Sequence, residues 1–299
     1  MIRVANAPCS WGVLEFESPT PPAPAAQVLD EMMAAGYVGT ELGDWGFLPT
    51  EPRTLSADVG RRGLSLAGAF VPVALARREA IDAGIEHAVR LARLLAGAGA
   101  ADAMIVLSDD NATVPNRTAR AGRVREEDGL RACEWDAFAQ HASRIAAAVR
   151  EATGMRTAFH HHCAGYVETP HEIDALMSRT DPSLLGLCLD TGHLMYGGGD
   201  PLVAASTYAS RIWHVHVKDC DPAVLERARA GAWDYHTAVR RGVFCELGRG
   251  MVPFGDVRDA LQSQHYSGWI VVEQDVFPGL GTPLASARRN RDYLRQLGL

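Results

Sequence analysis

Four short segments in the second half of the chain carry side chains that can bind a metal ion or move a proton. Each segment follows an apolar run with the length and composition of a strand. The segments are His160-His161-His162, Asp190-Thr191-Gly192-His193, His214-Val215-His216-Val217-Lys218-Asp219 and Glu273-Gln274-Asp275. Imidazoles and carboxylates without thiolates are typical of a catalytic divalent-cation site with positions left open for substrate oxygens. The pattern favours Mn²⁺ or Co²⁺, with Mg²⁺ or Zn²⁺ as alternatives.

Strand alternation narrows the choice of ligands, because residues two apart on a strand share a face. His160 and His162 point to one side of their strand, and His161 points outward to the other, where we expect a structural role. His214 and His216 also share a face, with Lys218 beyond them. Lys218 is the only lysine among 29 basic residues, which indicates a specific chemical need at this position.

Each of these residues also has an ordinary structural alternative. A single histidine at a strand end is more often hydrogen-bonded than metal-bound, by about three to one. Asp190 could cap a helix, and Glu273 could pair with an arginine. Lys218 and Asp219 could form a solvated pair. These alternatives would all have to hold on four successive strands at the same end, so we favour a joint metal site.

The elements that must position these residues alternate between strand and helix patterns along the chain. The expected strands are Ile2–Asn6, Gly39–Gly43, Leu64–Phe70, Ala103–Leu107, Met155–His160, Leu185–Asp190, Arg211–Val217 and Gly268–Glu273. The expected helices are Ala25–Ala35, Leu55–Arg62, Glu79–Ala98, Trp135–Ala152, Pro170–Ser178, Pro201–Ser210, Pro253–Gln264 and Pro283–Leu297. The long polar segments Ser108–Glu134 and Asp219–Gly250 are predicted to be loops that cover the active site or bind there.

This alternation predicts an α/β fold, a single-domain (β/α)₈ TIM barrel over residues 1–299. In such a barrel the active site lies at the C-terminal ends of the strands, where the four segments fall. A doubly wound open sheet is the competing architecture. It usually carries a glycine-rich phosphate loop after its first strand, and Asn6-Ala7-Pro8-Cys9-Ser10-Trp11-Gly12 is not such a loop.

The overall composition excludes several classes of function. A formal net charge of −7 argues against a surface that binds nucleic acid. No apolar run of about 18 residues occurs, so we expect no membrane span. The N-terminal residues lack the pattern of a secretion signal, and the six cysteines are scattered without a C-x-x-C pair. We therefore expect a cytoplasmic protein with reduced thiols.

At these residues the sequence resembles the sugar-phosphate isomerase/epimerase superfamily, the xylose isomerase-like TIM barrels that include inosose dehydratases. The matching motifs are Leu187-Cys188-Leu189-Asp190-Thr191-Gly192-His193, His214-Val215-His216-Val217-Lys218-Asp219, Leu247-Gly248-Arg249-Gly250-Met251-Val252-Pro253-Phe254 and Ile270-Val271-Val272-Glu273. The segments Asn6–Gly12, Thr40-Glu41-Leu42-Gly43 and His160–Pro170 are similar to the inosose dehydratase branch. The resemblance implies a metal held by His160, Asp190, His216 and Glu273, with His160 in place of the glutamate that family members usually carry.

The resemblance further implies a metal-dependent dehydratase for a cyclic keto-polyol such as 2-keto-myo-inositol. The reaction removes a proton beside the carbonyl and a hydroxide from the next carbon, through an enediolate that the metal would stabilise. The candidate bases are His162, His193 and Glu41. Lys218 would protonate the departing hydroxide or offset the enediolate charge. We expect Trp11, Trp45 and Phe70 to form an apolar wall against the substrate. Asp219 and Arg249 are expected to contact its polar groups. Tyr235 and His236, in the same long loop as Arg249, are further candidates for substrate contacts.

Three alternatives remain open at this point. A ketose isomerase or 3-epimerase would use nearly the same parts, although the histidine at position 160 argues against a symmetric exchange between two carboxylates. A phosphodiesterase of the endonuclease IV type should have a basic surface and more ligands on the first four strands. A non-catalytic sugar-binding barrel would bind polyols without needing Lys218. We expect a small-molecule keto-sugar as the partner, and the family allows a homo-oligomer.

Overall fold

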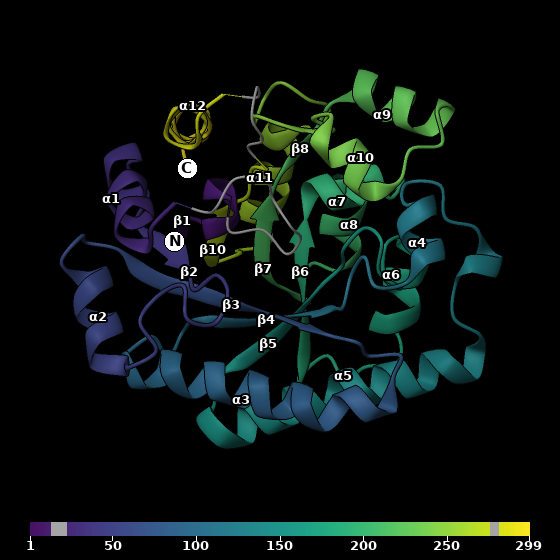
Figure 1. The fold of residues 1–299 in the computed structure, drawn as a ribbon, viewed down its shortest axis with the longest axis horizontal. Helices are drawn as coiled ribbons and strands as arrows, with labels where there is room; N and C mark the ends of the chain where they lie inside the picture. The colour runs from purple at the N-terminus through teal and green to yellow at the C-terminus, as the bar shows by residue number, and fades with distance from the viewer. Residues whose placement is uncertain (13–22, 276–280) are drawn as a thin grey trace.

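Eight parallel strands close into one barrel in a computed structural model, which describes residues 1–12, 23–275 and 281–299 (Figure 1). The strand order around the barrel is β1-β10-β7-β6-β5-β4-β3-β2, so neighbours in the chain are neighbours in space. The strands are β1 (Ile2–Asn6), β2 (Gly39–Glu41), β3 (Ser65–Val73), β4 (Met104–Asp109), β5 (Arg156–His160), β6 (Leu185–Asp190), β7 (Ile212–Val217) and β10 (Gly268–Val272). The predicted TIM barrel and all eight of its strands are confirmed, with small shifts at their ends.

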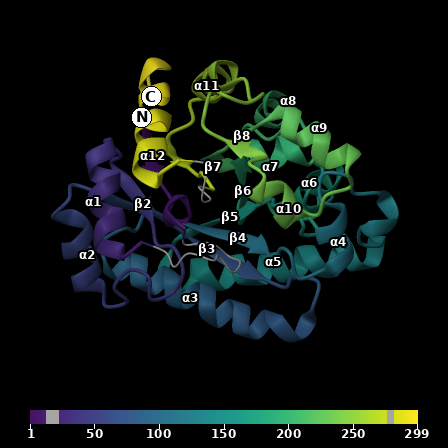
Figure 2. The same cartoon turned by 45° about the horizontal axis from the view of Figure 1, so that its top comes forward.

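Helices surround the barrel, as the two ribbon views show (Figures 1 and 2). They include α1 (Ala25–Ala35), α2 (Pro52–Gly60), α3 (Ile81–Gly97), α5 (Ala132–Thr153), α6 (Pro170–Met177), α7 (Thr191–Tyr196), α8 (Pro201–Thr207), α11 (Phe254–Ser263) and α12 (Pro283–Gln296). Pro170 and Pro201 occupy the first helical turn, where a missing N–H costs nothing. Gly36 and Gly154 end α1 and α5 with φ of 87° and 75°, a conformation that favours glycine.

The two long segments predicted to be loops contain secondary structure of their own, which corrects that expectation. Ser108–Glu134 contains the end of β4, helix α4 (Pro115–Arg120) and the start of α5. Asp219–Gly250 contains helices α9 (Pro222–Ala230) and α10 (Tyr235–Arg240) and a two-stranded antiparallel sheet of β8 (Asp219–Cys220) and β9 (Phe244–Cys245). Short helices with few apolar positions give weak periodicity, so the sequence pattern did not reveal them. No helix in the described part of the chain is long and apolar enough to cross a membrane.

Packing divides the barrel into an apolar outer layer and a lumen that becomes polar toward the strand ends. Side chains between the strands and helices form the main core, for example Val71, Leu95, Phe138 and Phe159. Inside the barrel a smaller cluster holds Met104, Val106, Ala158 and Cys188. Two residues further along β5 and β6, the same face carries His160 and Asp190. Because side chains two apart on a strand share a face, the apolar lumen leads directly to the candidate site.

A buried ion pair fixes the segment that follows β5. The guanidinium of Arg117, on α4, is fully buried and donates to Glu172 Oε1 at 2.7 Å and Oε2 at 2.9 Å. Its Nε donates to the carbonyl oxygen of Gly165 at 2.7 Å. Glu168, in the same segment, accepts from the backbone N–H groups of Gly122 and Ala164. These contacts hold residues 161–169, which include His162, against α4 and α6.

We expect Arg117→Met to destabilise the protein by about 3–5 kcal/mol, because it leaves the buried carboxylate of Glu172 without its cation. Arg125→Met is the matched control, since the Arg125–Glu127 pair is exposed at both partners and its loss should stay within about 0.5 kcal/mol. Urea denaturation would measure both free energies of unfolding. Equal stability of the two variants would contradict the structural role of Arg117.

Candidate metal centre and substrate cavity

Four side chains, three of them buried and that of Glu273 partly exposed, converge at the C-terminal ends of consecutive barrel strands. His160, Asp190, His216 and Glu273 each offer one ligand atom, and these atoms lie within 4.8 Å of one another. His160 Nε2 is 3.5 Å from Asp190 Oδ2, and His216 Nδ1 is 3.1 Å from Glu273 Oε1. The structure therefore brings together the four residues that the resemblance implied as ligands.

The polar atoms of this cluster lack the partners that buried groups normally have. Among the described residues, both ring nitrogens of His160, Nδ1 of His216 and Oδ2 of Asp190 are buried without a hydrogen bond. Burial lowers the pKa of His160 to about 3, so its ring is neutral and keeps a lone pair for a ligand bond. Several orphaned atoms at one point are costly unless something binds them. Two imidazoles and two carboxylates fit a divalent cation such as Mn²⁺ or Co²⁺.

The Asp-Thr-Gly-His motif explains how Asp190 and Lys218 come to lie side by side. Asp190 Oδ1 caps α7 by accepting from the N–H of His193 at 2.7 Å, which leaves Oδ2 for the cluster. Thr191 Oγ1 bonds to the backbone of Lys218 at 2.8 and 3.0 Å. A Cβ at Gly192 would lie 2.7 Å from the Cβ of Lys218, so only glycine allows this approach. Asp190 thus caps a helix and offers a free ligand atom as well.

Two other groups of metal-capable side chains overlap the cluster. Cys188 lies near His160 and His216, two residues before Asp190 on the same face of β6. Burial raises the pKa of the Cys188 thiol to about 11, so it stays protonated and is a poor ligand. Glu41, His214 and His216 form the second group, but its atoms already pair, since Glu41 Oε1 accepts from His214 Nε2 at 2.8 Å and from His216 Nε2 at 3.1 Å.

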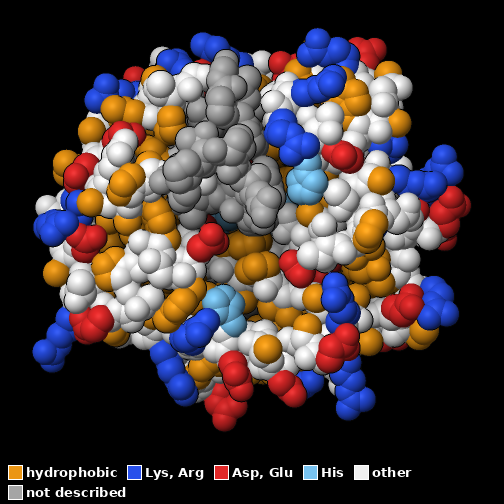
Figure 3. Space-filling model, in the orientation of Figure 1, with side chains coloured by type: hydrophobic (Ala, Val, Ile, Leu, Met, Phe, Trp, Pro, Cys, Tyr) orange, Lys and Arg blue, Asp and Glu red, His pale blue; other side chains and the backbone are white. Residues whose placement is uncertain are grey.

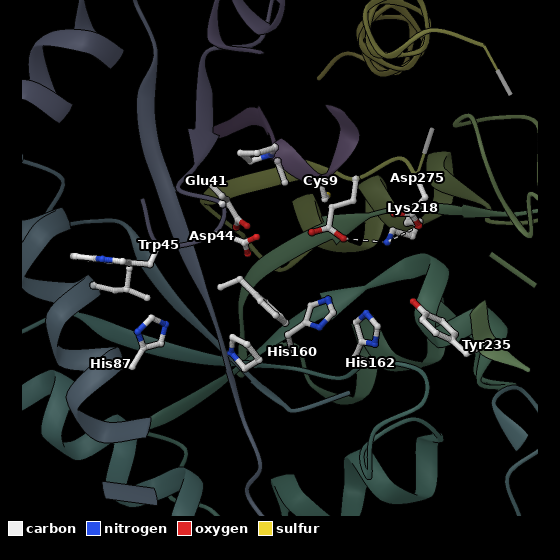
Figure 4. A pocket seen from close by; sticks show the side chains of 17 residues that line it. Cys9, Glu41, Asp44, Trp45, His87, His160, His162, Lys218, Tyr235 and Asp275 are labelled. Carbon is white, nitrogen blue, oxygen red and sulfur yellow. Dashed lines mark ion pairs between the residues drawn. The ribbon is translucent and has the colours of Figure 1, made fainter. Parts of the chain in front are cut away.

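A cavity of about 170 Å³ opens onto the cluster, smaller than the roughly 300–1,000 Å³ of sites for drug-sized ligands. The centre of the face in Figure 3 is hollowed, with apolar side chains visible inside. In the close view, Trp45 and His87 lie at one end and Lys218 and Tyr235 at the other, with His160 and His162 between them (Figure 4). This size suits a molecule no larger than a monosaccharide.

Lys218 is surrounded by acids at the inner end of the cavity. Its Nζ lies 3.2 Å from Glu273 Oε2 and 3.5 Å from Asp275 Oδ2, the pairs dashed in Figure 4. Burial by itself lowers the pKa of the Lys218 ammonium, but Asp275, Glu273 and Asp190 raise that pKa well above its usual value. The surface-pair alternative is therefore wrong, because this side chain is buried and carries a fixed positive charge beside the cluster.

The three candidate bases occupy different positions. His162 lines the cavity, and its Nδ1 lies 2.7 Å from the carbonyl oxygen of Cys163. A carbonyl only accepts, so Nδ1 carries the proton and Nε2 keeps a lone pair. His193 packs behind it, with ring centroids 3.8 Å apart, and does not line the described cavity. Glu41 lines the cavity but is already bonded to two histidines. His162 is the best placed of the three to accept a proton.

Three of the expected substrate contacts lie outside the cavity that the described residues form. Trp11 is buried in the main core, where its Nε1 donates to Glu31 Oε2 at 2.6 Å. Asp219 points away from Lys218 and accepts from the backbone N–H groups of Cys220, Gly248, Gly250 and Val252. Arg249 is two-thirds exposed and pairs with Glu246. None of the three lines the cavity formed by the described residues, whereas Trp45, Phe70 and Tyr235 do.

The structure adds cavity residues that were not predicted, namely Cys9, Asp44, His87 and Asp275. A signal for Asp275 was present, because the segment Glu273-Gln274-Asp275 follows the end of a barrel strand, where active sites form. His87 is on α3, outside the barrel, so the rule that sites form at strand ends could not find it. His161, expected to be structural, accepts from the backbone N–H of Asp190 at 3.1 Å and is fully buried.

The chain is similar to known proteins over its full length. A sequence profile of the family described as Xylose isomerase-like TIM barrel matches residues 29–297. An inosose dehydratase of Geobacillus kaustophilus (strain HTA426) is 33% identical, over 99% of this chain and 94% of the relative. The rhizopine catabolism protein MocC of Rhizobium meliloti is 33% identical, over 99% of this chain and 88% of the relative. A solved L-ribulose 3-epimerase superposes with a TM-score of 0.70 at 17% identity, over 99% and 94% of the two chains, which supports the fold alone.

Proposed function

The chain belongs to the xylose isomerase-like TIM barrel family, and we propose that it is a metal-dependent hydro-lyase that removes water from a neutral cyclic keto-polyol such as 2-keto-myo-inositol. One observation carries the proposal. A cluster of unpaired, buried ligand atoms lies at the wall of a small cavity, with a charged lysine and a neutral histidine beside it. Full-length similarity to proteins named inosose dehydratase supports the choice of reaction.

The charges around the cavity support a neutral substrate. Its described lining includes four carboxylates, from Glu41, Asp44, Glu273 and Asp275, and one ammonium, from Lys218. The ammonium is already paired with two of these carboxylates. A divalent cation would bring the sum of these charges only to about −1, so a phosphate or carboxylate on the substrate would be repelled. Hydroxyl groups, by contrast, can donate to these carboxylates and accept from imidazole N–H groups.

The side chains then have distinct roles. A divalent cation held by His160, Asp190, His216 and Glu273 would polarise the substrate carbonyl. His162 Nε2 takes the proton from the carbon beside the carbonyl. The bond between the next carbon and its hydroxyl oxygen breaks, and the ammonium of Lys218 stabilises or protonates the hydroxide that leaves as water. Phe70 and Trp45 contribute an apolar wall that excludes water from one side of the ring.

We expect metal-free protein to be inactive on 2-keto-myo-inositol and to regain turnover when Mn²⁺ or Co²⁺ is restored, with Mg²⁺ and Zn²⁺ as comparisons. The product dione absorbs in the ultraviolet, so the growth of absorbance measures the rate. A phosphorylated analogue of the same ring, added as a competitor, should inhibit weakly.

No absorbance change with any metal, together with epimerisation of a ketose in the same metal series, would replace the dehydratase by an isomerase or epimerase. Strong competition by the phosphorylated analogue would contradict the neutral-substrate class, even if the dehydration itself is observed.

A further inference from the structure

Glu41 occupies an unusual place for a cavity carboxylate, because it reaches across the barrel from β2 to β7. Its Oε1 accepts from Nε2 of both His214 and His216. All three side chains are almost fully buried, with 4%, 1% and 1% of their surfaces exposed. The strand pairing between β2 and β3 shifts register at Thr40 and Glu41, an irregularity of the kind that redirects a side chain. Gly68 on β3 leaves room for the carboxylate, since a Cβ there would lie 3.2 Å from Glu41 Oε1.

These hydrogen bonds determine which nitrogen of His216 is free. Glu41 Oε1 lies 2.8 Å from His214 Nε2 and 3.1 Å from His216 Nε2, and a carboxylate oxygen accepts hydrogen bonds, so both ring nitrogens donate to it. His216 Nε2 must therefore carry the proton. Its Nδ1 faces Glu273 and the ligand cluster, so it is the nitrogen that a cation in the cluster would bind. The same carboxylate restrains the ring orientation, because the imidazole is anchored at the nitrogen opposite the cluster.

We infer that Glu41 is a positioning residue for the metal centre, which fixes the tautomer and orientation of His216 and raises the affinity for the cation, and is not the proton-abstracting base. His214 contributes to this positioning, since its hydrogen bond to Glu41 Oε1 holds the carboxylate in place. The inference rests on the metal centre of the proposed function, but not on the identity of the substrate. Partners of this kind that orient a ligating histidine typically change metal affinity by 10–100-fold.

The test compares Glu41→Ala, Glu41→Gln and Asp44→Asn in metal-free protein titrated with Mn²⁺ or Co²⁺ by calorimetry. We expect Glu41→Ala to weaken binding by about 10–100-fold. Glu41→Gln should lose less, because its amide oxygen still accepts one hydrogen bond, although more weakly than a carboxylate. Asp44→Asn removes one negative charge from the same cavity without touching His216, and should change the affinity by less than about threefold. Circular dichroism checks that each variant is folded, and the isosteric Glu41→Gln carries the test if Glu41→Ala does not fold.

A second readout addresses the hydrogen bond directly. In ¹⁵N spectra of the metal-free protein, His216 Nε2 should be protonated and hydrogen-bonded to a carboxylate. This hydrogen bond should be lost in Glu41→Ala and kept in Asp44→Asn.

Unchanged metal affinity in both Glu41 variants, with a large fall in kcat, would overturn the inference and make Glu41 the base. Two equivalents of metal bound by the wild type, one of them lost in Glu41→Ala, would also overturn it in favour of a second cation at Glu41, His214 and His216. Failure of the wild type to bind any of the metals would instead refute the proposed metal centre itself.

Discussion

His160→Ala should reduce turnover by about a thousandfold or more, because it removes one of four ligands from a site expected to supply several kcal/mol of transition-state stabilisation. His160 is 2% exposed and neutral, and both of its ring nitrogens lack a hydrogen bond among the described residues. The ring packs against Phe70 and His161, but no hydrogen bond among the described residues accounts for its two nitrogens. The measurement pairs the turnover rate with metal content by elemental analysis, and both should fall together.

Two variants make this result specific. His141→Ala removes another buried histidine, on α5, whose Nδ1 lies 2.8 Å from the carbonyl oxygen of Leu75 and which does not line the described cavity. It should keep wild-type turnover after correction for folded protein. His160→Glu replaces the imidazole by a carboxylate, which is also a ligand for such cations, and should retain metal. If His160→Ala kept both its metal and its activity, the four-ligand centre would be incorrect.

Lys218→Met should lower kcat by about 10²–10⁴-fold while the substrate KM changes little, which is the usual range for loss of a positioned proton-transfer group. The ammonium is buried, paired with Glu273 and Asp275, and packed 4.8 Å above the ring of Phe244. Its positive charge stabilises the transition state most, because negative charge develops on the leaving oxygen there. The substitution should therefore lower kcat more than it changes KM. Steady-state kinetics at saturating metal separate the two constants.

A conservative variant and a chemical rescue distinguish a part in proton transfer from a role of Lys218 only as the counter-ion of Glu273 and Asp275. Lys218→Arg keeps the charge, but its planar guanidinium does not fit the place of a compact ammonium, so activity should return only in part. Added methylammonium should restore some turnover to Lys218→Ala, because a small cation can enter the vacated space. A kcat within tenfold of wild type for Lys218→Met would leave Lys218 as a counter-ion for Glu273 and Asp275, without a part in the reaction.

The expected substrate contacts that lie outside the cavity share one physical cause. Residue type and a position near a strand end or in the long loop indicate Trp11, Asp219 and Arg249, but they do not show which way each side chain points. Asp219 follows Lys218 directly but turns away from the cavity, toward the backbone N–H groups of residues 248–252. Arg249 extends into solvent beside Glu246. Both directions depend on the fold of the segment after β7, which the sequence pattern did not reveal.

The sequence alone determined the barrel and the four residues at its rim. Alternating strand and helix patterns predict parallel strands that neighbour one another in chain order, so motifs at the ends of β5, β6, β7 and β10 had to meet. Period-two alternation then grouped His160 with His162 and His214 with His216 on shared faces. The choice of His160, Asp190, His216 and Glu273 as ligands came from the resemblance to the xylose isomerase-like family.

Only the tertiary structure decided which atoms are free and which are paired. Glu41 and His214 are 173 positions apart and meet across the barrel lumen, so no local pattern relates them. That contact and the one to Nε2 of His216 place Glu41 beside a candidate metal ligand. In the same way, the carbonyl of Cys163 decides which nitrogen of His162 is available, and the packing of α3 brings His87 to the cavity. Hydrogen-bond partners depend on directions and distances in three dimensions, which residue types and spacing do not specify.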